Sequence, residues 1–189
     1  MAIYLDEEQV GSDANSVAYP HLVLCMGVTC LMGDGTLVGV HITAPLTEAA
    51  SMANFLTEIQ ANASAMNTLY LIGNTTIHCT RDRQMTVHEN ARSKAAAIEY
   101  AGKIHTYDTG HIKPQDGTFA QITTNGADQK CTIVYKRNEK MAYAKGEAPR
   151  NERGYQCGVA PTIGHSLVVG ATTMHTASHF WHMTDTTVT

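Results

Sequence analysis

Two residue types that can form a thiol nucleophile and its base lie close together in the first quarter of the sequence. Cys25 stands at the head of an apolar run, and His41 follows sixteen positions later across the turn Gly33-Asp34-Gly35-Thr36. The apolar runs on either side of this turn predict a β-hairpin. An imidazole beside a cysteine favours the thiolate and can then protonate a leaving group. The spacing therefore predicts a Cys–His site carried by a hairpin.

The same run holds a second cysteine, Cys30, so the identity of the nucleophile depends on the hairpin register. If the loop is 33–35, Cys25 shares a sheet face with His41, whereas a loop one residue longer puts Cys30 on that face. A third interpretation is that these cysteines and His41 have only a structural role. Free cysteines often pack as small buried hydrophobes, and a histidine can be satisfied inside a sheet.

The hairpin and its surroundings resemble a family of deamidases. The likeness rests on Cys25, the apolar strand 26–32, the turn, and the segment Gly39-Val40-His41-Ile42-Thr43-Ala44-Pro45. Together these are similar to the chemoreceptor glutamine deamidases (the CheD family) and to the toxin deamidases of the cytotoxic necrotizing factor and Burkholderia lethal factor type. The likeness covers the order of elements from Ala2 to Lys136. In that family the nucleophile stands at the head of the first strand, which favours Cys25.

This resemblance implies an α+β fold: a mixed, largely antiparallel sheet or sandwich flanked by two helices. It also implies a protein-glutamine deamidase in which Cys25 is the nucleophile and His41 the base. Such an enzyme needs no cofactor and no metal, and its partner is a protein that presents a surface glutamine. Transglutamination, with an amine in place of water, is a close variant. The alternative function is a non-catalytic protein-binding module on the same fold.

The sequence also departs from the family pattern. Val23 and Leu24 replace the small residues usual before the cysteine, and Tyr19 stands where a threonine is expected. The start of a Gly-rich loop is kept at Asp108-Thr109-Gly110-His111, but the following residues diverge. The departures before Cys25 favour the protein-binding module. The divergent loop predicts a substrate other than a chemoreceptor and, together with the C-terminal extension, favours a bacterial effector or toxin role.

Composition excludes several other classes of function. The chain has 189 residues, 43% hydrophobic and 16% charged, and a net charge of -4. This balance is typical of a globular protein and gives no indication of a nucleic-acid partner. The N-terminus has no signal-peptide pattern and no run is long enough to span a bilayer, so we expect synthesis in the cytoplasm, no membrane partner, and delivery to a target cell in a toxin role. Five scattered cysteines indicate reduced thiols.

We expect one domain over 1–189, with a polar loop over 137–164 and a C-terminal extension over 165–189. Apolar residues at helical spacing predict two helices, from Thr47 to about Ala63 and from Thr86 to Gly102. The remaining expectations are a loop over 6–19 and strands over 2–5, 69–72 with an extension over 77–80, 103–109, 118–124 and 131–136, followed by one or two C-terminal edge strands.

Four histidines, the last at His182, gather near the C-terminus. His175 and His179 have a spacing that could hold a metal on a helix. The surrounding threonines make a helix unfavourable there, so the sequence does not predict a metal site.

Overall fold

The computed structural model describes most of the chain up to Arg137 and short strands beyond it. The described residues are 3–20, 22–43, 47–80, 86–109, 118–125, 130–137, 150–151, 154–156, 175–176 and 181–187. The helices are α1 (Glu48–Gln60), α2 (Thr75–Thr80) and α3 (Val87–Ala97). The strands are β1 (Ile3–Tyr4), β2 (Val10–Asp13), β3 (Ser16–Tyr19), β4 (Met26–Met32), β5 (Leu37–Ile42), β6 (Met66–Gly73), β7 (Lys103–Asp108), β8 (Thr118–Asn125), β9 (Lys130–Arg137), β10 (Arg150–Asn151), β11 (Gly154–Gln156), β12 (His175–Thr176) and β13 (Trp181–Thr187).

Within these ranges, six strands form one sheet in the order β13-β7-β6-β4-β5-β2. Its neighbouring strands are antiparallel except β6 and β7, which run parallel. Parallel neighbours need a crossover connection, and the chain supplies α2 and α3 between β6 and β7. As a result, the C-terminal ends of β5, β6 and β7 lie at the same end of the sheet as the start of β4.

Seven described strands form a second sheet in the order β10-β11-β1-β3-β8-β9-β12. Only β1 and β3 are parallel in it, and every other pair is antiparallel. The β3–β8 pair joins residues about a hundred positions apart, such as Val17 and Ile122. This sheet is therefore built from long-range pairs between the N-terminal segment and the second half of the chain.

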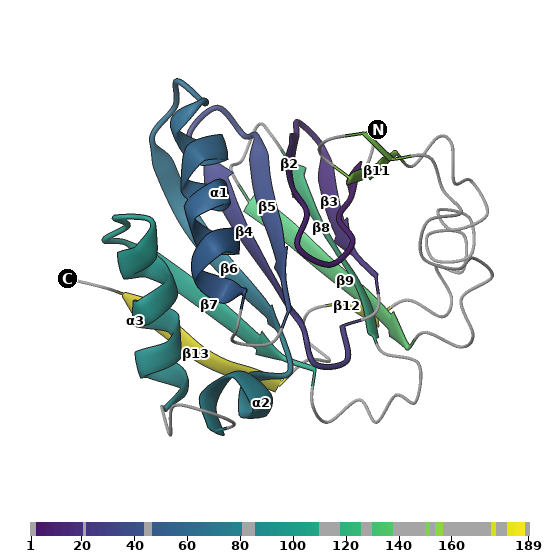
Figure 1. Cartoon of the computed structure of the whole chain (residues 1–189), viewed down its shortest axis with the longest axis vertical. Helices are drawn as coiled ribbons and strands as arrows, with labels where there is room; N and C mark the ends of the chain where they lie inside the picture. The colour runs from purple at the N-terminus through teal and green to yellow at the C-terminus, as the bar shows by residue number, and fades with distance from the viewer. Residues whose placement is uncertain are drawn as a thin grey trace.

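The two sheets and the helices form three layers. Helices α1 and α3 lie over one face of the six-stranded sheet (Figure 1). Alternate residues of β4 and β5 point toward the helices, because side chains alternate between the faces of a strand. The apolar core of this helix–sheet layer includes Val28, Cys30, Val38 and Val40 from the hairpin, Met52, Phe55 and Ile59 from α1, and Ala91, Ala95 and Ile98 from α3.

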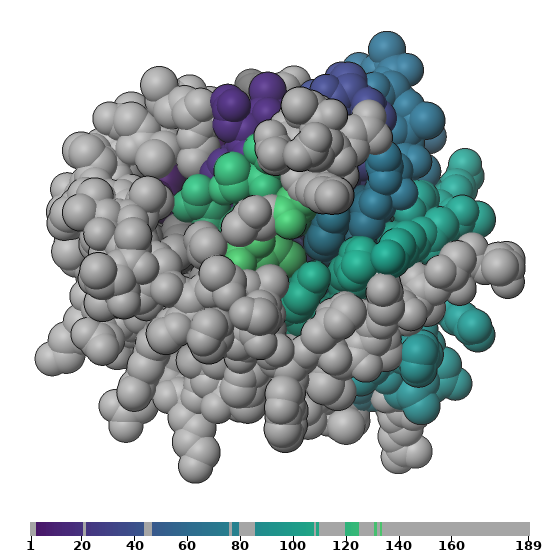
Figure 2. Space-filling model, turned by 180° about the vertical axis from the view of Figure 1, so that it is seen from behind, coloured from purple at the N-terminus to yellow at the C-terminus, as the bar shows by residue number. Residues whose placement is uncertain are grey.

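The other face of the six-stranded sheet packs against the seven-stranded sheet. Figure 2 shows the molecule from behind, with described residues of β8 and β9 (green) between the N-terminal strands (purple) and the blue-to-teal part of the chain. The inter-sheet core consists of the opposite set of hairpin residues and their partners, including Cys25, Leu31, Leu37, Ile72, Val17, Tyr19 and Ile122. The chain thus has mixed α+β content with two mainly antiparallel sheets, which confirms the predicted α+β class.

The expected loop over 6–19 is wrong, because this polar segment contains β2 and β3. Strand β2 pairs with β5 at the edge of the six-stranded sheet. Every residue of β3 is buried, and its polar Ser16 accepts a hydrogen bond of 2.8 Å from Nε2 of Gln121. Strand pairing is made by hydrogen bonds between backbone groups and does not require apolar side chains. A polar strand is therefore stable where its buried side chains also form hydrogen bonds.

The expected strand extension over 77–80 is also wrong, since Thr75–Thr80 is the helix α2. Asn74 begins it by accepting the backbone N–H of Ile77 on its side-chain oxygen, at 3.3 Å. The helix then packs on α3, where the Asn90 side-chain amide donates to the backbone carbonyl of His78 at 3.2 Å. These tertiary contacts outweigh the strand preference of a short apolar stretch.

The two long helices form where the sequence predicts them, with shorter ends. Thr86 and Glu89 form a capping box at the start of α3. The helix ends at Ala97 and does not reach Gly102, because Glu99 adopts a left-handed φ of 56°. Helix α1 begins after Thr47 and ends at Gln60.

The strands expected in the second half of the chain are present as β7, β8 and β9, and no end differs from its predicted position by more than one residue. The polar stretch 137–164 contains β10 and β11, so it is not entirely loop. The C-terminal extension supplies β12 and β13 as edge strands, and β13 pairs with β7 along the six-stranded sheet.

Candidate functional site

The hairpin register decides which cysteine shares a face with the histidine. Gly27 pairs with His41 and Leu31 with Leu37, and the backbone N–H of Met32 bonds the carbonyl of Thr36 at 2.8 Å. The loop is therefore 33–35, the shorter of the two alternatives. Cys25 belongs to the inter-sheet core, the face of the six-stranded sheet on which His41 lies.

Cys25 immediately precedes β4 and is only 5% exposed. Its Sγ lies 4.0 Å from Oε1 of Glu7, a distance at the outer limit for an S–H donor. A carboxylate beside a thiol opposes ionisation of the thiol. The two residues before Cys25, Val23 and Leu24, are 37% and 41% exposed, so the chain leaves the surface immediately before the buried thiol.

His41 is fully buried, and its orientation is set by two contacts. The ring nitrogen Nδ1 lies 2.8 Å from the backbone carbonyl of Leu5. A carbonyl oxygen can only accept, so Nδ1 carries the hydrogen and Nε2 carries a lone pair. The backbone N–H of His41 bonds the carbonyl of Gln9, and its carbonyl accepts from Glu8. The histidine is thus held as the tautomer that a general base requires.

Tyr19, at the position where a threonine was expected, provides the second contact to His41. Its ring meets the imidazole edge-on, with centroids 5.9 Å apart at 84°, and its hydroxyl donates to the carbonyl of Val28 at 2.9 Å. Glycine at positions 27 and 39 makes room for this ring, because a Cβ at either would lie 2.5 Å from Tyr19. Burial holds the pKa of the Tyr19 phenol above its usual range, so the phenol stays neutral and supports the histidine by packing.

Cys30 lies on the opposite face of β4, in the core beneath the helices, and is fully buried. Burial raises the pKa of the Cys30 thiol to about 12. A thiol with this pKa is almost entirely protonated at neutral pH, and the thiolate is the nucleophilic form. The geometry therefore places the two cysteines on opposite faces of the six-stranded sheet.

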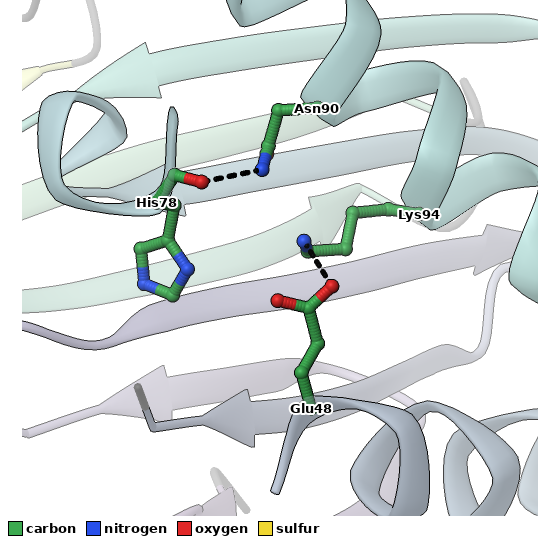
Figure 3. A network of polar contacts seen from close by, with 4 residues as sticks. All are labelled: Glu48, His78, Asn90 and Lys94. Carbon is green, nitrogen blue, oxygen red and sulfur yellow. Dashed lines mark hydrogen bonds and ion pairs between the residues drawn. The ribbon is translucent and has the colours of Figure 1, made fainter. Parts of the chain in front are cut away.

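Beside the start of α1 lies a buried polar cluster that the sequence did not reveal. Glu48 and Lys94 form an ion pair of 2.7 Å between α1 and α3 with side chains 9% and 1% exposed, and His78 of α2 lies beside it (Figure 3). The pKa of His78 is lowered from 6.5 to about 4, first by burial and then by the positive charge of Lys94. The charge of His41 makes a smaller contribution to this lowering of the His78 pKa.

A sequence signal for this cluster is hard to find. Glu48 and Lys94 look like ordinary first-turn and solvated-face residues of two amphipathic helices, and His78 falls in a stretch expected to be strand. Only the packing of α1 against α3 brings the two charges together.

The described residues contain no group of three or more potential metal ligands. Of the C-terminal histidines, His165 and His179 lie outside the described residues, as does Cys157. Among the described residues, Cys25, Cys30, Cys79 and Cys131 form no disulfide bond. No helix in the described part of the chain is long and apolar enough to cross a membrane.

The arrangement thus places a thiol and a lone-pair imidazole nitrogen on one face, at the end of the sheet where several loops begin. Such a pair can perform nucleophilic attack on an acyl carbon. No protein-family model matches the sequence, and no curated protein matches it. The function therefore rests on this geometry and on the resemblance described above.

Proposed function

We propose that this protein is a cysteine-dependent glutamine deamidase in which Cys25 is the nucleophile and His41 the general base. The observation that carries the proposal is the register of the β4–β5 hairpin. It puts Cys25 diagonally across from His41 on one face, with Nδ1 of His41 bonded to the carbonyl of Leu5. The α+β arrangement of two sheets and covering helices supports the resemblance to the CheD and toxin deamidases.

The reaction starts with the proton of the Cys25 thiol, which passes to Nε2 of His41 as sulfur attacks the side-chain amide carbon. The imidazolium then protonates the nitrogen, ammonia leaves, and a thioester remains. Nε2 next takes a proton from water, and the hydroxide attacks the thioester carbon. Sulfur leaves and regains the proton from His41. The products are ammonia and glutamate, and the sequence of steps needs no cofactor.

Two features define the substrate. Backbone N–H groups near Cys25 would bind the oxyanion, as acyl-transfer sites require. The small exposed fraction of Cys25 calls for a slender side chain such as glutamine, carried by a protein that reaches the surface beside Val23 and Leu24. Because one neutral amide becomes a carboxylate, the modified protein gains one negative charge. A bacterial effector acting on a protein of another cell is the biological role that we propose.

The experiment is alkylation of each cysteine as a function of pH, read by peptide mass spectrometry. We expect Cys25 to react fast well below about pH 8.5, the usual midpoint for a free thiol, while Cys30 stays slow. The variant His41→Asn keeps a side-chain N–H for the Leu5 carbonyl but has no base, and it should abolish the fast reaction. The exposed His88 on α3 gives the matched control, His88→Asn. Fast labelling of Cys30 instead would reassign the nucleophile.

The second candidate function, a protein-binding module, is favoured by the near-complete burial of Cys25 and by the carboxylate of Glu7 beside it. In that case every cysteine reacts slowly and His41→Asn changes nothing. If Cys25 is fast and dependent on His41, the decisive step is to incubate the protein with cell lysates. Glutamine residues that gain about 1 Da in the presence of wild type, but not of Cys25→Ala, identify the target.

A further inference from the structure

The corner between β6 and α2 contacts three consecutive residues just before β4, ending at the proposed nucleophile. A Cβ added at Gly73 would lie 2.6 Å from the carbonyl oxygen of Cys25, so the two backbones are in close contact there. The Asn74 side chain reaches the carbonyl of Val23 at 3.5 Å. The Leu24 backbone raises the pKa of His78, opposing the larger effect of burial, so this backbone lies close to the ring. One short segment thus contacts Val23, Leu24 and Cys25 in turn.

The corner itself is well anchored. The carbonyl of Gly73 accepts the backbone N–H of Thr109 at 2.9 Å, which ties it to the end of β7. Asn90 of α3 donates to the carbonyl of His78. The ring of His78 is 4% exposed and lies beside the Glu48–Lys94 ion pair (Figure 3). An anchored corner of this kind can hold the segment before β4 that it touches.

We propose that the corner Gly73–His78 fixes the backbone of the Cys25 segment and that His78 is its positioning residue. Among the described residues, neither ring nitrogen of His78 has a partner at full hydrogen-bond geometry. A buried polar group is costly without a partner, and the Leu24 backbone is the neighbouring group that can supply one. The imidazole of His78 therefore influences the position of the Cys25 thiol indirectly, through the backbone of residues 23–25.

This inference depends on the proposed function only in its catalytic consequence. The holding of residues 22–27 by the corner is a property of the fold, and it can be measured whether or not Cys25 is a nucleophile. The measurement is amide hydrogen exchange of the full-length protein, followed on peptides that cover residues 22–27. A peptide from α1 serves as the internal reference for global opening.

The decisive variants are His78→Leu, which keeps an apolar group of moderate size in the core, and His78→Gln and His78→Asn, which keep a side-chain N–H. We expect exchange at residues 22–27 to accelerate about tenfold in His78→Leu, because the Leu24 backbone loses its polar neighbour. At least one of the two amide variants should restore slow exchange. The exposed-histidine variant His88→Leu should leave this segment unchanged.

A second variant perturbs the same segment through Gly73 instead of His78. Gly73→Ala pushes a methyl group against the Cys25 carbonyl, whereas Gly33→Ala meets its nearest atom at 3.4 Å and is the matched control. We expect faster exchange at 22–27 in the first variant only. In both His78→Leu and Gly73→Ala, the pH midpoint of Cys25 alkylation should move up toward that of a free thiol.

Unchanged exchange at residues 22–27 in His78→Leu overturns the inference. So does equal acceleration in the α1 peptide, or failure of both amide variants to restore protection, because each would assign His78 a purely packing role. If wild-type Cys25 reacts slowly and ignores His41, the proposed deamidase function fails instead. The exchange data then still decide whether the corner holds the segment.

Discussion

The buried His78 should make the stability of this protein sensitive to mild acid. Its pKa in the folded chain is about 4, against an ordinary value of 6.5. As the pH falls, the unfolded chain therefore takes up a proton on this ring before the folded chain does. The stability that neutral His78 provides is complete above about pH 6.5 and is lost progressively as the pH falls toward 4. The perturbation that tests this is His78→Gln, which keeps a polar side chain but cannot titrate.

The magnitude follows from the two pKa values. The difference between 6.5 and about 4 corresponds to about 3 kcal/mol over the whole range, at about 1.4 kcal/mol for each tenfold change. Between pH 7 and pH 5 the expected loss is about 2 kcal/mol. Burial is the main cause of the lowered pKa and the Lys94 charge is the second, while Glu48 partly offsets them.

The assay is urea unfolding of wild type and His78→Gln at pH 7, 6 and 5. We expect the free energy of unfolding to fall between pH 7 and pH 5 by about 2 kcal/mol more in wild type than in His78→Gln. His88→Gln, which removes an exposed histidine, should behave as wild type. Equal pH dependence in wild type and His78→Gln would refute the reasoning, since it would mean that His78 is protonated as easily in the folded chain as in the unfolded one.

Three further outcomes follow from contacts in the structure. Lys94→Met removes the positive charge that pairs with the buried Glu48 and should cost about 3–5 kcal/mol in urea unfolding. Adding Glu48→Gln should recover most of this, and a double variant as unstable as the single one would contradict the ion-pair argument. Glu7→Gln removes a negative charge near the Cys25 sulfur and should speed its alkylation at neutral pH, so an unchanged rate would mean that this carboxylate does not act on the thiol. Gly27→Ala forces a methyl group into the Tyr19 ring and should destabilise the fold by about 1–3 kcal/mol, whereas the control Gly33→Ala should be tolerated. Equal unfolding free energies for the two variants would count against the close packing of Tyr19.

Much of the architecture could be predicted from local signals in the sequence. The Gly-Asp-Gly turn between two apolar runs predicts the hairpin, and helical spacing of apolar residues predicts α1 and α3. These signals work because turn chemistry and a buried helical face depend on neighbours within a few residues. The strands β2 and β3 gave no such signal, because their stability comes from backbone pairing with partners that lie far away in the chain.

For the site, the sequence determined the residue types and the fact that a hairpin joins Cys25 to His41. It left open which of Cys25 and Cys30 shares a sheet face with His41, because a single residue in the loop reverses which side chains share a face. Only the tertiary structure decided this, through the register that buries Cys30 under the helices and Cys25 between the sheets. The same holds for the Glu48–Lys94 pair and for His78, whose partners are brought close by the packing of separate helices and not by sequence spacing.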